Sequence, residues 1–274
     1  MRARRTDGRR QGATMTVTYW NYLKLDELLS LQQPLSQGPE HDETLFIIIH
    51  QVYELWFKEM LHELDHLQNL LATNQTPRAQ HTLKRVLTIL KTLVAQIDVL
   101  ETMTPLEFLA FRDRLEQGSG FQSAQFRELE FALGRKDPAA MERYPAGSTA
   151  RRRLDARYRA PTLWDAFLRY LEANGYRAGE DVNERNVTLP IVPSPTTQKV
   201  LIQVYRTNPV VAGVCERLVD LDEGFQEWRY RHVKMVERTI GDKVGTGGSA
   251  GAEYLRKSLF QPAFPDLWAI RTAF

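Results

Sequence analysis

Histidines are the residues of this 274-residue chain whose spacing most directly suggests chemistry, because four of the six lie between residues 41 and 71. The segment HELDH matches H-E-x-x-H, in which two histidines one helical turn apart bind zinc and the glutamate acts as general base. A metzincin would continue with a glycine and a third histidine, which are absent at the required positions. A zinc peptidase using His62, Glu63 and His66 is one alternative, and histidines on a solvated face are the other.

A second pair of histidines occupies positions that helical periodicity turns toward the interior. Residues 41–71 have the pattern of a long helix, and its apolar face carries Phe46, His50, Tyr53, Phe57, Leu61, Leu64 and Gln68, opposite His62 and His66. His232 takes an apolar position in a further helix that runs from Pro209 to Gly241. It is either a core histidine with satisfied hydrogen bonds or a ligand directed into the interior.

Two inward histidines on different helices are too few for a zinc site, which needs three or four protein ligands. One axial histidine is enough to hold a haem iron, and a second can serve the distal side. The chain lacks C-x-x-C-H, so any haem would be bound non-covalently. The pattern therefore indicates a haem pocket as one hypothesis among several.

Two further features could bind an anion. Arg112 follows Phe108 by one helical turn, so its guanidinium could bind a carboxylate at the edge of an apolar pocket, or form an ion pair with Glu107 or Asp113. The segment GTGGSAG at 245–251 could cradle an anion with backbone amides, or be a mobile surface loop. It has neither the ending of a P-loop nor the preceding strand of a Rossmann turn.

The elements that would position these residues are all helical. Residues 18–34 predict a short helix or arm with Tyr19 and Tyr22 on one face, and 76–104 predict a second long core helix. Residues 104–135 divide at Gly118-Ser119-Gly120 into two helical pieces, and 137–200 form an excursion with a helical island at 161–173. No strand and helix alternation occurs, so we predict a single large all-α domain with long core helices.

Composition limits the classes of function. Net charge is +2, and five arginines stand among the first ten residues, so the rest of the chain is not basic and a nucleic-acid-binding surface is not expected. Residues 1–17 are predicted to be a disordered basic tail, with Met15 a candidate start. No apolar run is long enough to cross a membrane, and the single Cys215, expected in the core, fits a reducing compartment. A cytoplasmic protein is therefore expected.

Several segments resemble the bacterial type of the tryptophan 2,3-dioxygenase family, in the family's order: YWNYLKLDELLSLQQPLS, HDETLFIIIHQVYELWFKEMLHEL, FRDRLEQGSGFQSAQFRELE, EWRYRHVKMVERTIG, GTGGSAGAEYLRKSL and FPDLWAIRT. The resemblance implies an all-helical homotetramer, a dimer of dimers, with one non-covalent haem b per subunit that is ferrous when active. It also implies that residues 18–274 form a dioxygenase domain. Such an enzyme opens the indole C2–C3 bond of L-tryptophan with O2 to give N-formyl-L-kynurenine, the first step of the kynurenine pathway of tryptophan degradation.

The same resemblance implies roles for individual residues. His232 would be the proximal ligand of the haem iron, and His50 the distal histidine that meets the indole N–H. Phe46 would line the indole pocket, Arg112 would pair with the substrate carboxylate, and Thr246 would contact the amino-acid end of the substrate.

Other positions carry over from the same motifs. Ser119 would lie near both haem and substrate, and Gly247 near the cofactor. Tyr19 and Tyr22 correspond to aromatic residues that the family contributes to a neighbouring subunit's site. Phe108 would also contact substrate, at a position where some relatives have tyrosine. A haem-binding sensor without dioxygenase activity would keep His232 but would need neither Arg112 nor the glycine loop.

Overall fold

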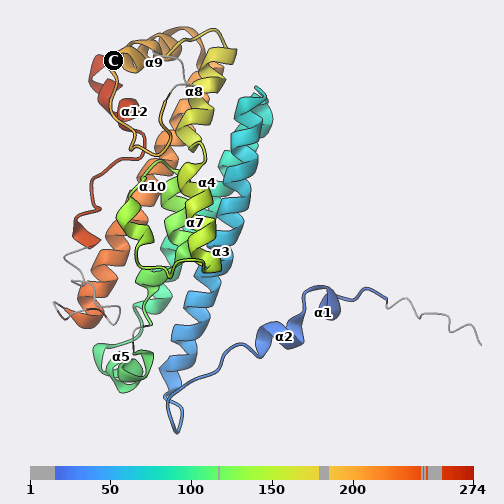
Figure 1. Ribbon diagram of the computed structural model, residues 1–274, viewed down its shortest axis with the longest axis vertical. Helices are drawn as coiled ribbons and strands as arrows, with labels where there is room; N and C mark the ends of the chain where they lie inside the picture. Colours follow the sequence, from blue (N-terminus) through green and yellow to red (C-terminus); the bar gives the residue numbers. More distant parts are fainter. Residues whose placement is uncertain (1–15, 117, 179–184, 242, 244, 246–254) are drawn as a thin grey trace, which may run out of the picture.

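A computed structural model describes residues 16–116, 118–178, 185–241, 243, 245 and 255–274. All regular elements among these residues are helices and none is a strand, which confirms the predicted all-α class. Three long helices dominate: α3 (His41–Ala72), α4 (Thr76–Leu100) and α10 (Pro209–Ile240). They run side by side along the long axis of the molecule (Figure 1).

The shorter elements surround these three helices. They are α1 (Tyr19–Tyr22), α2 (Leu25–Leu29), α5 (Pro105–Arg112), α6 (Ala124–Ala132), α7 (Thr149–Arg159), α8 (Leu163–Ala173), α9 (Pro195–Thr207) and α12 (Pro265–Ala269), with four short 3-10 helices, η1 (Asp113–Leu115), η2 (Gly120–Gln122), η3 (Pro138–Met141) and η4 (Ile270–Ala273). The predicted long helices at 41–71 and from Pro209 are confirmed, and the helix predicted over 76–104 ends at Leu100.

The close packing of α4 against α10 depends on a glycine. A Cβ atom at Gly224 would lie 2.9 Å from Cδ2 of Leu90, which is buried on the facing helix. Any side chain at position 224 would therefore require the Leu90 side chain to shift. Cys215, on the same helix, is buried as predicted, and burial raises the pKa of its thiol to about 12.

The region 137–200 contributes to the main core. The helical island predicted at 161–173 is α8, which packs on α3 and buries Trp164, Phe167 and Tyr170. Two helices in this region, α7 and α9, were not predicted from the sequence. α7 is so rich in arginine that its short apolar stripe was obscured, and α9 begins with Pro195, which reads as a breaker but is well suited to the first turn of a helix.

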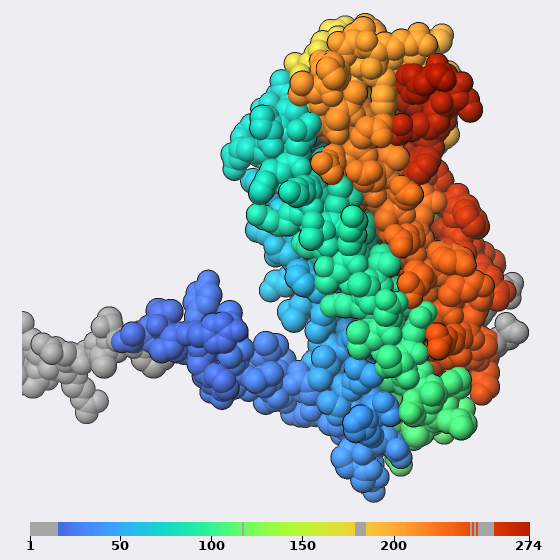
Figure 2. Space-filling view, turned by 180° about the vertical axis from the view of Figure 1, so that it is seen from behind, coloured from blue at the N-terminus to red at the C-terminus, as the bar shows by residue number. Residues whose placement is uncertain are grey.

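An N-terminal arm formed by α1 and α2 runs away from the bundle (Figures 1 and 2). Its first helix is held locally by a capping box between Thr18 and Asn21. The arm exposes apolar side chains that a protein normally buries, among them Tyr19 and Tyr22 at 76% and 75% exposure. The predicted short arm is therefore present, and the described residues of the chain leave its aromatic side chains uncovered.

Candidate functional site

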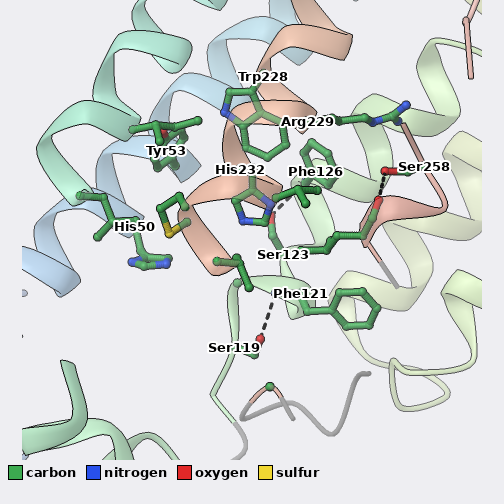
Figure 3. A pocket seen from close by; sticks show the side chains of 18 of the residues that line it. His50, Tyr53, Ser119, Phe121, Ser123, Phe126, Trp228, Arg229, His232 and Ser258 are labelled. Carbon is green, nitrogen blue, oxygen red and sulfur yellow. Dashed lines mark hydrogen bonds between the residues drawn. The ribbon is translucent and has the colours of Figure 1, made fainter. Parts of the chain in front are cut away.

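A cavity of about 440 Å³ lies at the end of the bundle where α3, α5, α6 and α10 meet. η2 and residues from Leu255 to Gln261 complete its wall. Figure 3 shows His50 and His232 entering this space from two different helices, with Ser119 and Phe121 on a third side. The two histidines that periodicity turned inward therefore line one cavity.

His232 is held on α10 by the aromatic ring of Trp228, one turn earlier. The two ring centroids are 5.1 Å apart and the planes differ by 7°, so the rings are stacked. Burial lowers the pKa of His232 to about 4, and the nearby charges of His50 and Arg127 act in the same direction. The imidazole is therefore neutral at pH 7, which is the form that binds a metal ion.

His50 is fixed by the backbone of its own helix. Its Nδ1 lies 2.7 Å from the carbonyl oxygen of Phe46 and donates the hydrogen bond, because a carbonyl can only accept. Burial lowers the pKa of His50, so the ring is neutral and Nε2 carries a lone pair. A Cβ atom at Gly120 would lie 3.7 Å from Nε2, so η2 passes close to this edge of the ring.

An aromatic wall adjoins His50. The ring of Phe46 lies 4.1 Å from the imidazole and 5.8 Å from the ring of Phe108, between centroids. Phe108 stands on α5, one turn before Arg112, and both line the cavity. Thr104 caps α5 and so fixes the start of this helix. A flat apolar group with a carboxylate at one end matches such a wall beside an arginine.

A buried cluster of charges forms another part of the cavity wall, and the sequence patterns did not reveal it. Glu130 of α6 accepts hydrogen bonds from Arg127 and, at 2.9 Å, from Arg229 of α10, and Arg135 lies 4.0 Å away. Burial raises the pKa of Glu130, but the three guanidinium charges outweigh this effect and hold the pKa below its usual value. Nε of Arg127 is buried without a hydrogen-bond partner among the described residues.

The only sequence signal for this cluster was the spacing of Arg127 and Glu130, three residues apart in a helix of mixed polar and apolar residues. Such a pair is common on exposed faces, where it has little functional meaning. Its burial depends on Arg229, which comes from a helix far along the chain.

The predicted site residues fall into three groups. The cavity brings together Phe46, His50, Phe108, Arg112, Ser119 and His232. Ser119 also caps η2, where its hydroxyl accepts a hydrogen bond from the Phe121 amide at 3.3 Å.

Tyr19 and Tyr22 do not line the cavity of their own chain. Thr246 and Gly247 lie outside the described residues, so their roles stay predictions; Gly245, just before them, lines the cavity.

The H-E-x-x-H segment lies on another face of α3. His62 and His66 are exposed, as the helical periodicity predicted, and Glu63 is buried in an ion pair with Arg85 at 2.7 Å. Within the described part of the chain, no three histidine, cysteine or acidic side chains are grouped so as to hold a metal ion. The carboxylate that would act as base is thus engaged elsewhere, which disfavours the zinc peptidase alternative.

The fold and site together define an all-helical protein in which two neutral histidines from separate helices share one cavity with an aromatic wall and an arginine. Comparison with known sequences places this protein within that class. It belongs to the tryptophan 2,3-dioxygenase family, whose model matches residues 4–174 and 184–274.

Individual relatives are similar in sequence to this chain over nearly their whole length. A tryptophan 2,3-dioxygenase of Herpetosiphon aurantiacus is 62% identical over 258 residues, covering 94% of this chain and 98% of the relative. One from Anaeromyxobacter sp. is 60% identical over 94% of this chain and 96% of the relative. One from Bacillus cereus is 42% identical, with 93% and 92% covered.

Among the residues that the structure describes, no helix combines the length and apolar character needed to cross a membrane.

Proposed function

We propose that this protein is a haem-dependent dioxygenase that opens the indole C2–C3 bond of L-tryptophan with O2, giving N-formyl-L-kynurenine as the first step of the kynurenine pathway. The observation that carries this proposal is the pair of neutral histidines, His50 and His232, on one cavity beside Arg112, in a chain of this family. A histidine on each side of a cavity suits a planar cofactor with one axial ligand and one distal group.

The residues present fit a haem group. His232 offers a neutral imidazole in the wall of the cavity, and its ring plane is fixed by Trp228. Haem also carries two carboxylates, and the buried Nε of Arg127 is a donor with no hydrogen-bond partner within the described part of the chain. When bound, haem supplies the dioxygen chemistry, for which the twenty amino acids have no equivalent.

The chain's own residues would orient the substrate. The lone pair of His50 Nε2 can accept a hydrogen bond from the indole N–H, and this does not require transfer of the proton. Arg112 can form a charge-assisted pair with the substrate carboxylate, and Phe46 and Phe108 form an apolar wall for the ring. Thr246 would contact the amino-acid end. Both oxygen atoms enter the product, so no external reductant is needed in a turnover, and positioning is the main contribution of the protein.

We also propose that the protein is a homotetramer, a dimer of dimers, in which Tyr19 and Tyr22 of one subunit reach the site of a neighbour. The exposure of these two rings on an arm that leaves the bundle supports the proposal. Ser119 and Gly247 are proposed to lie beside the cofactor. A cytoplasmic location and a dioxygenase domain over 18–274 stay predictions from the sequence. So does the disordered tail over residues 1–17, of which 1–15 lie outside the described residues.

One experiment tests the function. The purified protein is reduced, its absorption spectrum is recorded, and L-tryptophan is added under air. A Soret band with oxygen uptake and formation of N-formylkynurenine supports the dioxygenase. A Soret band without turnover would point to a haem-binding sensor, and bound zinc without haem to a peptidase.

The orienting role of His50 has its own test. His50→Ala should slow turnover but leave measurable activity, because the variant removes only the acceptor of the indole N–H. Complete loss of activity in a variant with full haem content would contradict a role limited to orientation.

A further inference from the structure

The arm is fastened to α3 by a buried carboxylate. The Glu43 side chain, on a residue only 1% exposed, accepts hydrogen bonds from the backbone amides of Leu35 at 2.6 Å and Ser36 at 3.0 Å, and also from the Ser36 hydroxyl. The same hydroxyl accepts a hydrogen bond from the amide of Glu40 at 2.9 Å. Buried carboxylates are rare unless they are fully paired, so this one is committed to holding the chain that enters α3.

A second attachment lies two turns further along α3. Oε1 of Gln51 accepts a hydrogen bond from Gln32 at 2.6 Å, and its Nε2 donates to the carbonyl oxygen of Leu31 at 3.1 Å. Eight residues of helix separate Glu43 from Gln51, which is roughly 12 Å along the axis. A segment held at one point can pivot, whereas a segment held at two separated points has a fixed direction.

The fixed direction leads away from the bundle. Beyond Leu31 the arm carries Tyr19, Tyr22 and Leu29 at 76%, 75% and 65% exposure, and Figure 2 shows it projecting from the body. Contiguous exposed apolar side chains mark an interaction surface. Because the two attachments hold the arm off its own bundle, the described residues of the same chain leave these side chains uncovered, and we assign the cover to a second copy.

Glu43 and Gln51 are close in sequence to two residues of the cavity wall. Phe46 follows Glu43 by three residues, and Gln51 follows His50 directly. The same turns of α3 therefore hold two cavity residues and both points that direct the arm.

We propose that Glu43 and Gln51 are positioning residues, which aim the arm of one copy of this chain so that Tyr19 and Tyr22 complete the cavity of a second copy. The exchange of arms rests on the proposed function. The two attachments explain why the arm docks in one direction, because α3 fixes the direction of the arm before it contacts the second copy. Less conformational freedom is therefore lost on docking.

The test uses the haem-loaded protein and the variants Glu43→Ala, Gln51→Leu, and Tyr19→Ala with Tyr22→Ala. Each of the first two changes is also combined with the tyrosine pair. The control is Lys58→Ala, at an exposed position of the same helix. Each protein is characterised by haem content, oligomeric state in sedimentation velocity, and KM and kcat for L-tryptophan.

Glu43→Ala and Gln51→Leu should each raise KM roughly tenfold, the scale of one lost aromatic contact, with a smaller change in kcat and unchanged haem content. Adding either change to the double tyrosine variant should raise KM no further, since both act through the same contact. Lys58→Ala should match the wild type.

Three results would overturn the proposal. They are wild-type KM in both Glu43→Ala and Gln51→Leu, a rise in KM that adds in full to that of the tyrosine variant, and a rise accompanied by loss of haem. The last two would mean that the residues act on Phe46 and His50 within their own subunit.

The proposed function fails separately, if the wild type shows no turnover, and the exchange of arms fails if the tyrosine variant alone behaves as the wild type. Should Glu43→Ala not fold, the partly exposed Gln51 and Gln32 still allow the test through Gln51→Leu and Gln32→Leu.

Discussion

Glu130→Gln should lower the free energy of unfolding by about 3 to 5 kcal/mol, the cost of removing one partner from a buried ion pair. Glu130 is surrounded by Arg127 and Arg229, whose side chains are 9% and 4% exposed, so solvent screens neither charge. An amide has one oxygen instead of two and no charge, so at least one guanidinium would lose its acceptor. The lower end of the range applies if the amide oxygen keeps one of the two hydrogen bonds.

The loss of unfolding free energy in Glu130→Gln should depend on pH, and it should be smaller in acid than at neutral pH. The pKa of Glu130 in the folded protein lies below its usual value of 4.5. Its contribution to stability is therefore complete above pH 4.5 and is lost as the pH falls through the folded-state pKa. Since Glu130→Gln cannot titrate, the difference between wild type and variant should be constant near neutral pH and shrink in acid.

Urea unfolding followed by circular dichroism, at several pH values, measures both effects. The control is Asp98→Asn, which breaks an ion pair with Arg231 in which the Asp98 side chain is 66% exposed, and which should cost less than about 1 kcal/mol. A Glu130→Gln variant as stable as Asp98→Asn would refute the reasoning. So would a difference from wild type that grows in acid.

Three further predictions concern single side chains. Arg112→Ala should lower kcat/KM about 10- to 100-fold through loss of a charge-assisted pair, with Arg112→Lys intermediate; unchanged steady-state kinetics would remove Arg112 from the site. Asp222→Asn should cost about 2 to 4 kcal/mol in urea unfolding, because the buried carboxylate accepts from the Ala263 and Phe264 amides and Trp268 Nε1, and one amide oxygen cannot serve them all. Lys136→Met should cost about 3 kcal/mol in the same assay, because Nζ donates to three carbonyl oxygens at 2.7, 2.9 and 3.0 Å near the end of α7; a loss below 1 kcal/mol would show that water replaces the ammonium.

The periodicity of apolar residues was sufficient to predict the long helices and the inward direction of His50 and His232. This succeeded because a residue's face on a long helix depends only on its neighbours in sequence. The same reasoning placed His62 and His66 outside, although they match a known zinc signature. That the two inward histidines share a cavity follows from how α3 and α10 pack, which local periodicity does not encode.

Other features could not be read from local pattern. Glu43 looks like a favourable charge at a helix start, and only the folded chain shows that it is buried against Leu35 and Ser36. The cluster around Glu130 likewise needs Arg229, about a hundred residues away. The helix of α7 was hidden by its arginines, one of which, Arg153, pairs with Glu128 at 2.9 Å.

The placement of the two histidines has a consequence for biosynthesis. His50 emerges from the ribosome early, on α3, whereas α10 and His232 follow only when most of the chain has been made. A nascent chain that has formed α3 and α4 therefore still lacks the helix that closes the cavity and stacks His232 on Trp228. Truncated products that end before α10 lack His232, and so lack the residue that we propose as the ligand of the haem iron.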